Sequence, residues 1–424
     1  MSSPQEAGAM RHSRLAMVLI VSLFFLWGVA HNLNDVLIPH FRKVFSLSDF
    51  ASGLVQFAFY LGYFLVAIPA ALFMQRYGYK RAVIFGLLLY GGGALLFLPA
   101  SRAESYGFFL GALFVIAAGL AFLETSANPM VVALGSADGA ERRLSFAQAF
   151  NPLGSIAGVA IGGSFILSGI ERTPAEVAAM DAAARAAWRA EEAAAVQGPY
   201  LAIGLGVLLW ALLIALTRFP AVADRPTEGE GRHGLAGFGS LLRRRAYRIG
   251  VLAQFCYVGA QVGIWSYTIR FVQAEVPGTP EGKAAGLLIV ALVLFMVGRF
   301  AGAALMKWVD PLRLLGLFGL INAALCLLAA FVGGAVGAVA LTASSFFMSI
   351  MFPTIFAASL RGLGELTKLG SSLIVMAIIG GAVLTAAMGL ISDASGLIRL
   401  AMLVPAAAFL VVAAFARFAR AEAA

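Results

Sequence analysis

The stretch 107–134 reads GFFLGALFVIAAGLAFLETSANPMVVAL. Every residue from Gly107 to Leu123 is apolar or glycine, and a membrane-crossing helix needs about 20 mostly apolar residues. The apolar residues form one block and not the narrow stripe of a half-buried helix. The stretch therefore predicts a helix surrounded by lipid or by other helices, with one acid, Glu124, inside it.

Composition extends this prediction to the whole chain. Hydrophobic residues make up 61% and charged residues 12% of the 424 residues, against about 45–50% and about 25% in soluble domains. The net charge of +9 does not indicate a nucleic-acid partner, because the basic residues stand between the apolar blocks. Cys256 and Cys326 lie in apolar segments and are expected to pack there, without a disulfide or a metal.

Twelve apolar segments can be placed along the chain. Those of the first half are 15–40, 52–74, 82–99, 107–134, 144–169 and 198–218. Those of the second half are 247–272, 284–306, 313–332, 336–360, 370–391 and 397–416. The sequence predicts an all-α membrane protein of twelve transmembrane helices, with an N-terminal half (1–218), a solvated linker (219–246) and a C-terminal half (247–424). This layout is that of a major facilitator, whose halves surround a site near the membrane mid-plane.

The distribution of Lys and Arg predicts the orientation. If the N-terminus is cytoplasmic, twenty of the thirty basic residues lie in cytoplasmic segments and eight in periplasmic ones. This bias predicts that both termini are cytoplasmic. The alanine-rich stretch 169–197 then lies in the periplasm, where we expect a surface helix that acts as a spacer or lid, or as a docking element.

Two acids stand apart from the other Asp and Glu residues. Nineteen of the 21 lie in loops, tails or span edges, whereas Asp35 and Glu124 lie inside spans. A charge at the centre of a bilayer costs about 2.5–3.5 kcal/mol on insertion scales. Apart from Arg218 at the last position of the sixth span, no Lys or Arg falls within the six N-terminal spans, so each carboxyl must be protonated, face a wet cavity or bond to polar neighbours. We predict that Asp35 and Glu124 couple transport to protons; the alternative is a buried acid that only caps a broken helix.

Polar side chains accompany both acids. Asp35 closes the run His31-Asn32-Leu33-Asn34-Asp35, in which His31 lies one helical turn before it. His31 either modulates Asp35 or is a plain hydrogen-bonding histidine, and Asn32 is a candidate solute ligand. Pro129 follows Glu124 by five residues and is expected to disturb the helix and free a carbonyl near Glu124–Thr125.

Further candidates for binding a solute lie in later spans. Gln148 and Asn151 share a helix face at the start of the fifth span, and amides both donate to and accept from sugar hydroxyls. In the second half Gln261 is a similar candidate, and Trp265 either stacks on a sugar ring or anchors at the membrane interface. Arg299 bonds the solute or a carboxylate, or forms a structural pair on the cytoplasmic side. We find no catalytic nucleophile, phosphate loop or metal-ligand cluster, so the sequence predicts no cofactor and no metal.

Several motifs together resemble the L-fucose:proton symporter family. They are Phe25-Leu26-Trp27-Gly28, His31 to Asp35, Gly53-Leu54-Val55-Gln56, Phe59 to Phe64, Leu123 to Pro129, Gln148 to Asn151, Ala253 to Gln261, Trp265-Ser266-Tyr267, Pro353 to Phe356 and Ser371 to Met376. The resemblance implies a twelve-helix major facilitator of the bacterial inner membrane that imports a sugar with protons by alternating access. It also implies that Asp35 and Glu124 are the coupling acids and that Gln148 and Asn151 touch the sugar.

The chain departs from this family at two places. Where the fucose transporters have Gln-Tyr before Pro-Thr, this chain has Met351-Phe352, so Phe352 gives the site an apolar wall in place of a hydroxyl. His31 stands where an Asn is expected, and it is expected to retune Asp35. The first departure leaves the sugar open, with glucose, galactose and N-acetylglucosamine as alternatives to L-fucose.

The sequence is therefore interpreted as a proton-coupled monosaccharide importer and not an enzyme. Its expected partners are the sugar and the lipid bilayer, with no nucleic acid, and the chain is expected to be a monomer. The alternatives are sodium coupling, a sensor without transport, and a membrane enzyme acting on lipid-linked sugars. The enzyme would need catalytic acids or a metal cluster at the membrane surface.

Overall fold

The structure is a computed structural model that describes residues 4–45, 49–133, 139–166, 176, 179–217, 219 and 236–423. Within these ranges the chain forms helices and no β-strand. Ten helical segments of the described residues are long and apolar enough to cross a membrane, and α1 holds a shorter apolar stretch, Ala16–Ala30. The all-α prediction is confirmed.

The first group of helices comes from the N-terminal part of the chain. It comprises α1 (Pro4–Phe45), α2 (Asp49–Tyr77), α3 (Tyr79–Leu95), α4 (Phe97–Arg102), α5 (Tyr106–Ala133), α6 (Ala140–Gln148), α7 (Asn151–Phe165), α9 (Ala182–Ala194) and α10 (Gln197–Leu216). Helix α5 packs against α2 and α3, α10 packs against α3, and α1 packs along α7. We call α1 to α10 the N-terminal group.

The second group follows α12 (Ala236–Arg243), which lies in the predicted linker. It comprises α13 (Arg245–Glu275), α14 (Glu281–Leu305), α15 (Pro311–Phe331), α16 (Gly334–Met348), α17 (Met351–Leu360), η3 (Gly364–Leu366), α18 (Thr367–Met376), η4 (Ala377–Ile379), α19 (Gly380–Ser395), η5 (Ile398–Met402) and α20 (Leu403–Ala423). Helix α15 packs against α16 and α20, and α13 packs against α19 and α20. We call α13 to α20 the C-terminal group.

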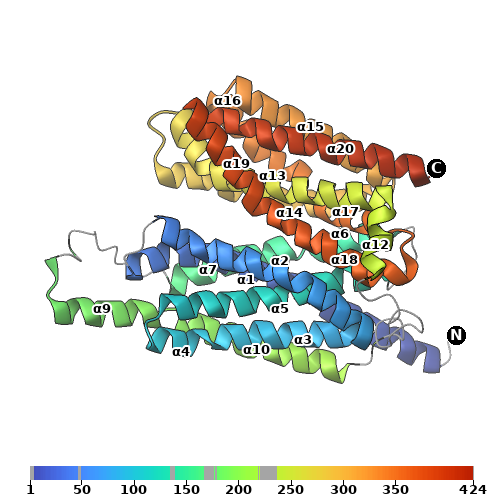
Figure 1. Cartoon of the computed structure of the whole chain (residues 1–424), viewed down its shortest axis with the longest axis horizontal. Coiled ribbons are helices and arrows are strands. Elements are labelled where there is room, and N and C mark those ends of the chain that lie inside the picture. Colours follow the sequence, from blue (N-terminus) through green and yellow to red (C-terminus); the bar gives the residue numbers. More distant parts are fainter. Residues whose placement is uncertain are drawn as a thin grey trace.

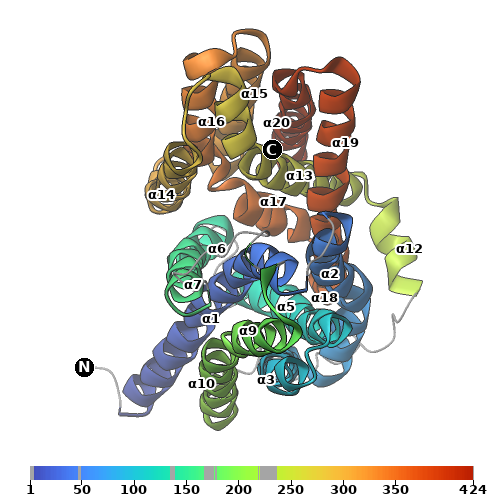
Figure 2. The ribbon, with the colours of Figure 1, turned by 90° about the vertical axis from the view of Figure 1, so that its left-hand side faces the viewer.

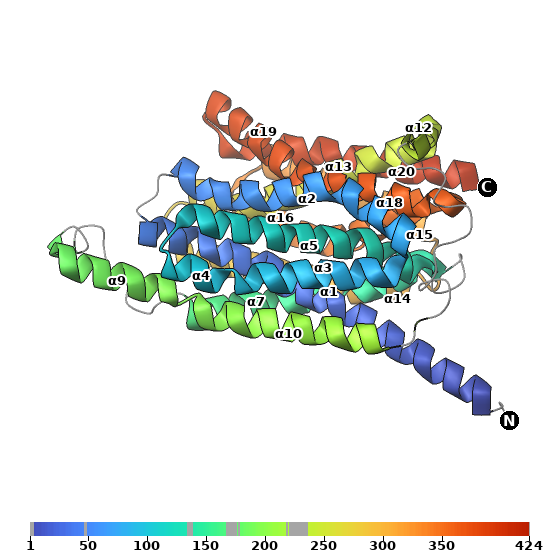
Figure 3. The same cartoon turned by 60° about the horizontal axis from the view of Figure 1, so that its bottom comes forward.

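The two groups lie side by side with their helices running in the same general direction (Figures 1 and 2). They meet where α2, α5 and α6 contact α14, α17 and α18. The chain termini and α12 lie at one end of this bundle, which we call the terminal end, and α9 projects at the opposite end, the α9 end (Figures 1 and 3).

Helix α9 belongs to the stretch 169–197, in which a surface helix was predicted. It is amphipathic, and its buried residues are Trp188, Glu192 and Ala193. The Ser101 hydroxyl donates to the carbonyl of Ala193 at 2.6 Å. A ring nitrogen of His40, at the end of α1, lies 3.1 Å from the carbonyl of Glu192. These contacts fix one face of α9 to the ends of α1 and α4.

Several predicted spans hold more than one helix where single helices were expected, and 144–169 and 336–360 are two of them. Within the predicted span 144–169, the described residues belong to the end of α6 and to α7, which a turn at Ala149–Phe150 separates. The break has a physical cause, because Pro152 has no N–H for the ladder and fits only the first turn of a new helix. Pro353 similarly lies in the first turn of α17, after the turn that ends α16.

Pro129 was expected to disturb its helix and to free a carbonyl near Glu124–Thr125. It lies inside α5, which continues without a break from Tyr106 to Ala133. The carbonyl that the proline frees is that of Thr125, four residues earlier. That carbonyl finds a donor on another helix, as shown below.

Helices α1 and α7 approach each other through glycine. A Cβ atom on Gly154 would lie 1.9 Å from the carbonyl oxygen of Phe25. No other residue fits there without moving a helix, so glycine at this position sets the distance between α1 and α7. Both helices line the cavity described next.

Candidate functional site

A cavity of about 220 Å³ lies between the two groups of helices. This leaves room for several water molecules or for one small solute. The residues that line it are Phe24, Trp27, Tyr60, Glu124, Gln148, Asn151, Pro152, Ser155, Val258, Gln261, Val262, Trp265, Ser266, Leu292, Phe295, Arg299, Phe352 and Ile378.

Most of the predicted site residues meet at this cavity. Its walls include Glu124, Gln148, Asn151, Gln261, Trp265, Arg299 and Phe352. They come from α5, α6, α7, α13, α14 and α17, so both groups contribute. The three predicted residues on α1, His31, Asn32 and Asp35, lie outside the described side chains, and their roles stay predictions.

Glu124 is buried on α5, with 8% of its surface exposed. Among the described residues its Oε2 atom is buried and has no hydrogen-bond partner. The Tyr63 side chain lies beside the carboxyl, and the charge of Arg299 acts on it from the other group. An unpartnered buried carboxylate oxygen is costly, so this geometry favours a carboxyl that takes up a proton or a ligand.

Arg299 joins the two groups at the cavity wall. Its Nη1 atom donates to the carbonyl oxygen of Gln148 at 2.7 Å and to the side-chain Oε1 at 3.1 Å. The carbonyl of Gln148 is available because Pro152, four residues later, has no N–H to give it. The guanidinium also lies 4.7 Å from the ring centre of Phe295. Of the predicted roles for Arg299, the structure shows a bond between the groups.

A chain of side chains leads from Arg299 to the helix of Glu124. The Nε2 atom of Gln148 donates to Oδ1 of Asn128 at 3.0 Å, and Nδ2 of Asn128 donates to the carbonyl of Glu124 at 3.0 Å. An amide has two N–H groups and two lone pairs, so Gln148 keeps one N–H and one lone pair for a ligand. Asn151 donates from Nδ2 to the carbonyl of Phe24 at 3.2 Å and keeps its Oδ1.

Aromatic rings form the apolar part of the wall. The indole N–H of Trp265 donates to the Ser345 hydroxyl at 3.1 Å, and its ring packs edge-on against Phe295 at 5.0 Å. Trp265 thus lies in the cavity wall. The rings of Phe24 and Trp27 stack at 4.7 Å. Such rings suit the C–H faces of a sugar.

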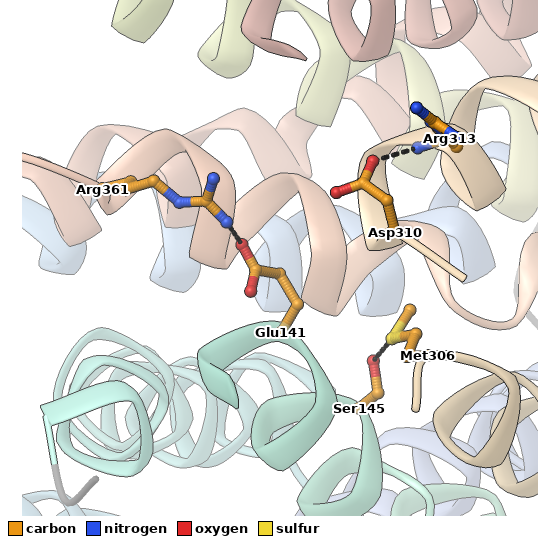
Figure 4. A network of polar contacts seen from close by, with 6 residues as sticks. All are labelled: Glu141, Ser145, Met306, Asp310, Arg313 and Arg361. Atoms are coloured by element: carbon orange, nitrogen blue, oxygen red, sulfur yellow. Dashed lines mark hydrogen bonds and ion pairs between the residues drawn. The ribbon is translucent and has the colours of Figure 1, made fainter. Parts of the chain in front are cut away.

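Contacts between the groups continue from the cavity to the terminal end. Glu141, Ser145 and Gln148 lie on one face of α6, at helical spacings of four and three. Glu141 forms an ion pair with Arg361, and the Ser145 hydroxyl lies 3.8 Å from the sulfur of Met306 (Figure 4). These contacts join the two groups between the cavity and the terminal end.

The described residues contain no group of three or more His, Cys, Asp or Glu side chains that could hold a metal ion. Cys256 and Cys326 are not paired with each other. The described cavity wall offers hydrogen-bonding groups, aromatic faces and the buried acid Glu124.

Comparison with protein families agrees with this arrangement. Residues 16–378 match the family model of the Major Facilitator Superfamily. The chain belongs to this superfamily. Its helices form the twelve-helix major facilitator fold, as the sequence predicts.

Relatives narrow the family further. The chain is 47% identical to the L-fucose-proton symporter of Escherichia coli K12 over 416 residues, which cover 98% of this chain and 95% of that protein. It is 37% identical over 402 residues to the glucose/galactose transporter of Brucella abortus, covering 94% and 93% of the two chains. This facilitator therefore belongs to the L-fucose:proton symporter family, and the interpretation as a transporter and not an enzyme is confirmed.

Solved structures give the same result. The E. coli fucose:proton symporter in its outward conformation superposes on 95% of this chain with a TM-score of 0.88 and 47% identity, over 98% of that structure. A proton:xylose symporter matches with a TM-score of 0.72 at 14% identity, over 95% and 94% of the two chains, which shows the shared facilitator fold alone.

Several residues of this facilitator's site were not predicted. Tyr60, Ser155 and Ser266 line the cavity, and Tyr257 lies beside Arg299. Tyr60 and Tyr63 are three residues apart and lie on one face of α2. This spacing could have indicated a polar face, but the apolar residues around it in the second span made it easy to miss. Tyr63, to which the sequence assigned no role, lies beside Glu124.

Proposed function

We propose that the chain is a secondary active transporter that imports a monosaccharide, L-fucose or a related hexose, by proton symport with alternating access. The observation that carries this proposal is the joint lining of one cavity by Glu124, three amides and an indole, with Oε2 of Glu124 buried and without a hydrogen-bond partner among the described residues. The names of the relatives, L-fucose-proton symporter and glucose/galactose transporter, support the substrate class.

Sugar recognition follows from the wall chemistry. Gln148, Asn151 and Gln261 present amides that donate to and accept from hydroxyls, and Asn32 of α1 is the predicted fourth. Trp265 offers an indole face for the ring. Phe352 offers no hydrogen bond, so we assign it the apolar side of the sugar, such as the C6 methyl group of a 6-deoxyhexose.

Proton coupling is assigned to Asp35 and Glu124. A protonated Glu124 is neutral and can be enclosed with the sugar, whereas the ionised form would be enclosed without a partner for Oε2. Loading of proton and sugar together then lowers the free-energy cost of enclosing the site while the halves move about it. His31 modulates Asp35 from one turn away. The coupling ion is H⁺, with Na⁺ as the alternative, and no cofactor takes part.

The orientation assigned by the basic residues places the terminal end in the cytoplasm and α9 in the periplasm, in the bacterial inner membrane. Both termini lie at one end of the bundle (Figure 1), which agrees with this assignment. The contacts of α6 then lie on the cytoplasmic side, which supports an outward-facing state like that of the E. coli relative solved in the outward conformation. The monomer is the transport unit, in which the halves 1–218 and 247–424 move about the site, joined by the linker 219–246.

Uptake into proteoliposomes tests the function. An imposed pH gradient, acidic outside, is expected to drive accumulation of radiolabelled L-fucose, with glucose, galactose and N-acetylglucosamine compared in parallel. Accumulation driven by a sodium gradient alone would refute proton coupling. Accumulation of none of these sugars would refute the substrate class.

Three variants test the assigned acids. Asp35→Asn and Glu124→Gln are each expected to abolish uphill uptake, while Glu124→Gln keeps part of the counterflow exchange. Glu275→Gln is the control, because Glu275 accepts from the backbone N–H of Gly334 far along α13 from the cavity, and the glutamine keeps an acceptor. Normal accumulation by both acid variants would show that other groups carry the proton.

A further inference from the structure

A second proline frees a backbone carbonyl close to Glu124. Pro129 lies inside α5 and has no N–H, so the carbonyl of Thr125, four residues earlier, lacks its helical donor. The hydroxyl of Ser371 on α18 lies 2.9 Å from that oxygen. Both residues are fully buried, at 0% exposure. A hydroxyl of the C-terminal group thus satisfies the backbone of the N-terminal group one residue from Glu124.

Ser371 has a second acceptor within its own helix. Its hydroxyl lies 2.8 Å from the carbonyl of Lys368, but inside α18 that carbonyl also has a backbone donor one turn on. The carbonyl of Thr125 has no such donor. Ser372, the next residue, is equally buried, and the described structure gives its hydroxyl only the carbonyl of Leu369 in the same helix, at 2.7 Å. Of these two neighbouring serines, Ser371 is the one that bridges the groups.

The same arrangement occurs at Arg299. There the carbonyl of Gln148, freed by Pro152, accepts from the guanidinium of the C-terminal group at 2.7 Å. Two prolines of the N-terminal group thus each expose a carbonyl, and each carbonyl accepts from a side chain of the other group. Both acceptors lie next to cavity residues, Glu124 in one case and Gln148 itself in the other. The repetition indicates docking points between the groups and not an incidental contact.

We propose that Ser371 is a positioning residue that ties closure of the terminal end to the helical turn carrying Glu124. When the groups part at the terminal end, the carbonyl of Thr125 loses its donor and takes water in its place. The turn beside Glu124 then becomes hydrated from the cytoplasmic side, where the proton is to be released. This inference rests on the proposed function, in which Glu124 carries the proton.

The test compares Ser371→Ala with Ser372→Ala in proteoliposomes of each orientation. Loss of the hydrogen bond between the groups is expected to shift the equilibrium about tenfold toward the state open at the terminal end. The apparent affinity for a sugar added at the terminal side scales with the fraction of protein that is open at that end. The L-fucose concentration that gives half-maximal uptake from the terminal side is therefore expected to fall by up to about tenfold. The concentration that gives half-maximal uptake from the α9 side is expected to rise. Ser372→Ala is expected to leave both concentrations unchanged.

A double-mutant cycle with Pro129→Ala separates docking from simple packing. Alanine at 129 restores an N–H that donates to the carbonyl of Thr125, so Ser371→Ala in this background is expected to have little further effect. Equal effects of Ser371→Ala with and without Pro129, or equal effects of the two serine variants, would overturn the proposal. Glu124→Gln in the same assay keeps the two proposals apart. If Glu124→Gln still couples protons, the proposed function fails, whatever the serine variants show.

Discussion

Replacement of Arg299 by Met tests whether the guanidinium holds the sugar site in shape. The change keeps much of the apolar stem but removes both bonds to Gln148, at 2.7 and 3.1 Å. It leaves the carbonyl that Pro152 frees without a donor, and it releases one end of the Gln148 amide. Hydrogen bonds to charged groups contribute about 1.5–3 kcal/mol each, and the water-filled cavity replaces part of this.

We therefore expect a loss of about 1–3 kcal/mol in sugar binding, or about 5- to 150-fold in affinity. Calorimetric titration of L-fucose into the purified transporter measures this without a proton gradient. Arg299→Lys is expected to recover only part of the affinity, because an ammonium cannot reproduce the fork of a guanidinium.

Arg270→Met is the matched control, since Arg270 is an exposed arginine on α13 that lies over the Tyr267 ring. A second comparison uses Gln148→Met. If Arg299 acts through the Gln148 amide, the double variant Arg299→Met with Gln148→Met binds about as weakly as either single variant. Affinity of Arg299→Met within twofold of the parent, or fully additive losses, would refute the reasoning.

Two further predictions concern the packing and the closed end. Gly154→Ala is expected to abolish folding and transport, because its Cβ would lie 1.9 Å from the Phe25 carbonyl oxygen. Gly206→Ala is the control and is expected to fold normally, because its Cβ would meet nothing within 4 Å. Size-exclusion profiles and sugar uptake distinguish the two variants. Arg361→Gln leaves the buried Glu141 without its ion-pair partner and is expected to open the terminal end. The L-fucose concentration that gives half-maximal uptake from the terminal side is then expected to fall severalfold. Arg361→Lys is expected to restore it. An unchanged concentration in Arg361→Gln would contradict the prediction.

The sequence predicted most of the fold because a bilayer leaves few solutions. Blocks such as 107–134 must be helices when no water is present to satisfy the backbone. The break between α6 and α7 was predictable in principle, since Pro152 stands in the predicted span. For Pro129, the sequence did not show that the helix continues past the proline. The carbonyl that Pro129 frees accepts from a hydroxyl that lies 246 residues away in the chain, and no pattern within the span contains that contact.

The candidate site was predictable in part for a similar reason. Charges and amides are rare inside spans, so Glu124, Gln148 and Arg299 stood out, and the structure places them around one cavity. Tyr63 and Ser371 did not stand out, because tyrosine and serine are common in membrane helices. Their positions depend on the packing of α2 and α18 against α5, which a pattern within one helix does not contain.

The two docking points have a consequence for how this interface can change during evolution. Their acceptors are backbone atoms, so substitution of Thr125 or Gln148 cannot remove them, and only the loss of a proline can. The donors, Ser371 and Arg299, are side chains, so a single substitution can remove them. Correlated change in a set of homologous sequences should therefore link Pro129 with position 371 and Pro152 with position 299. A comparison of side chains in contact across the interface would overlook both pairs.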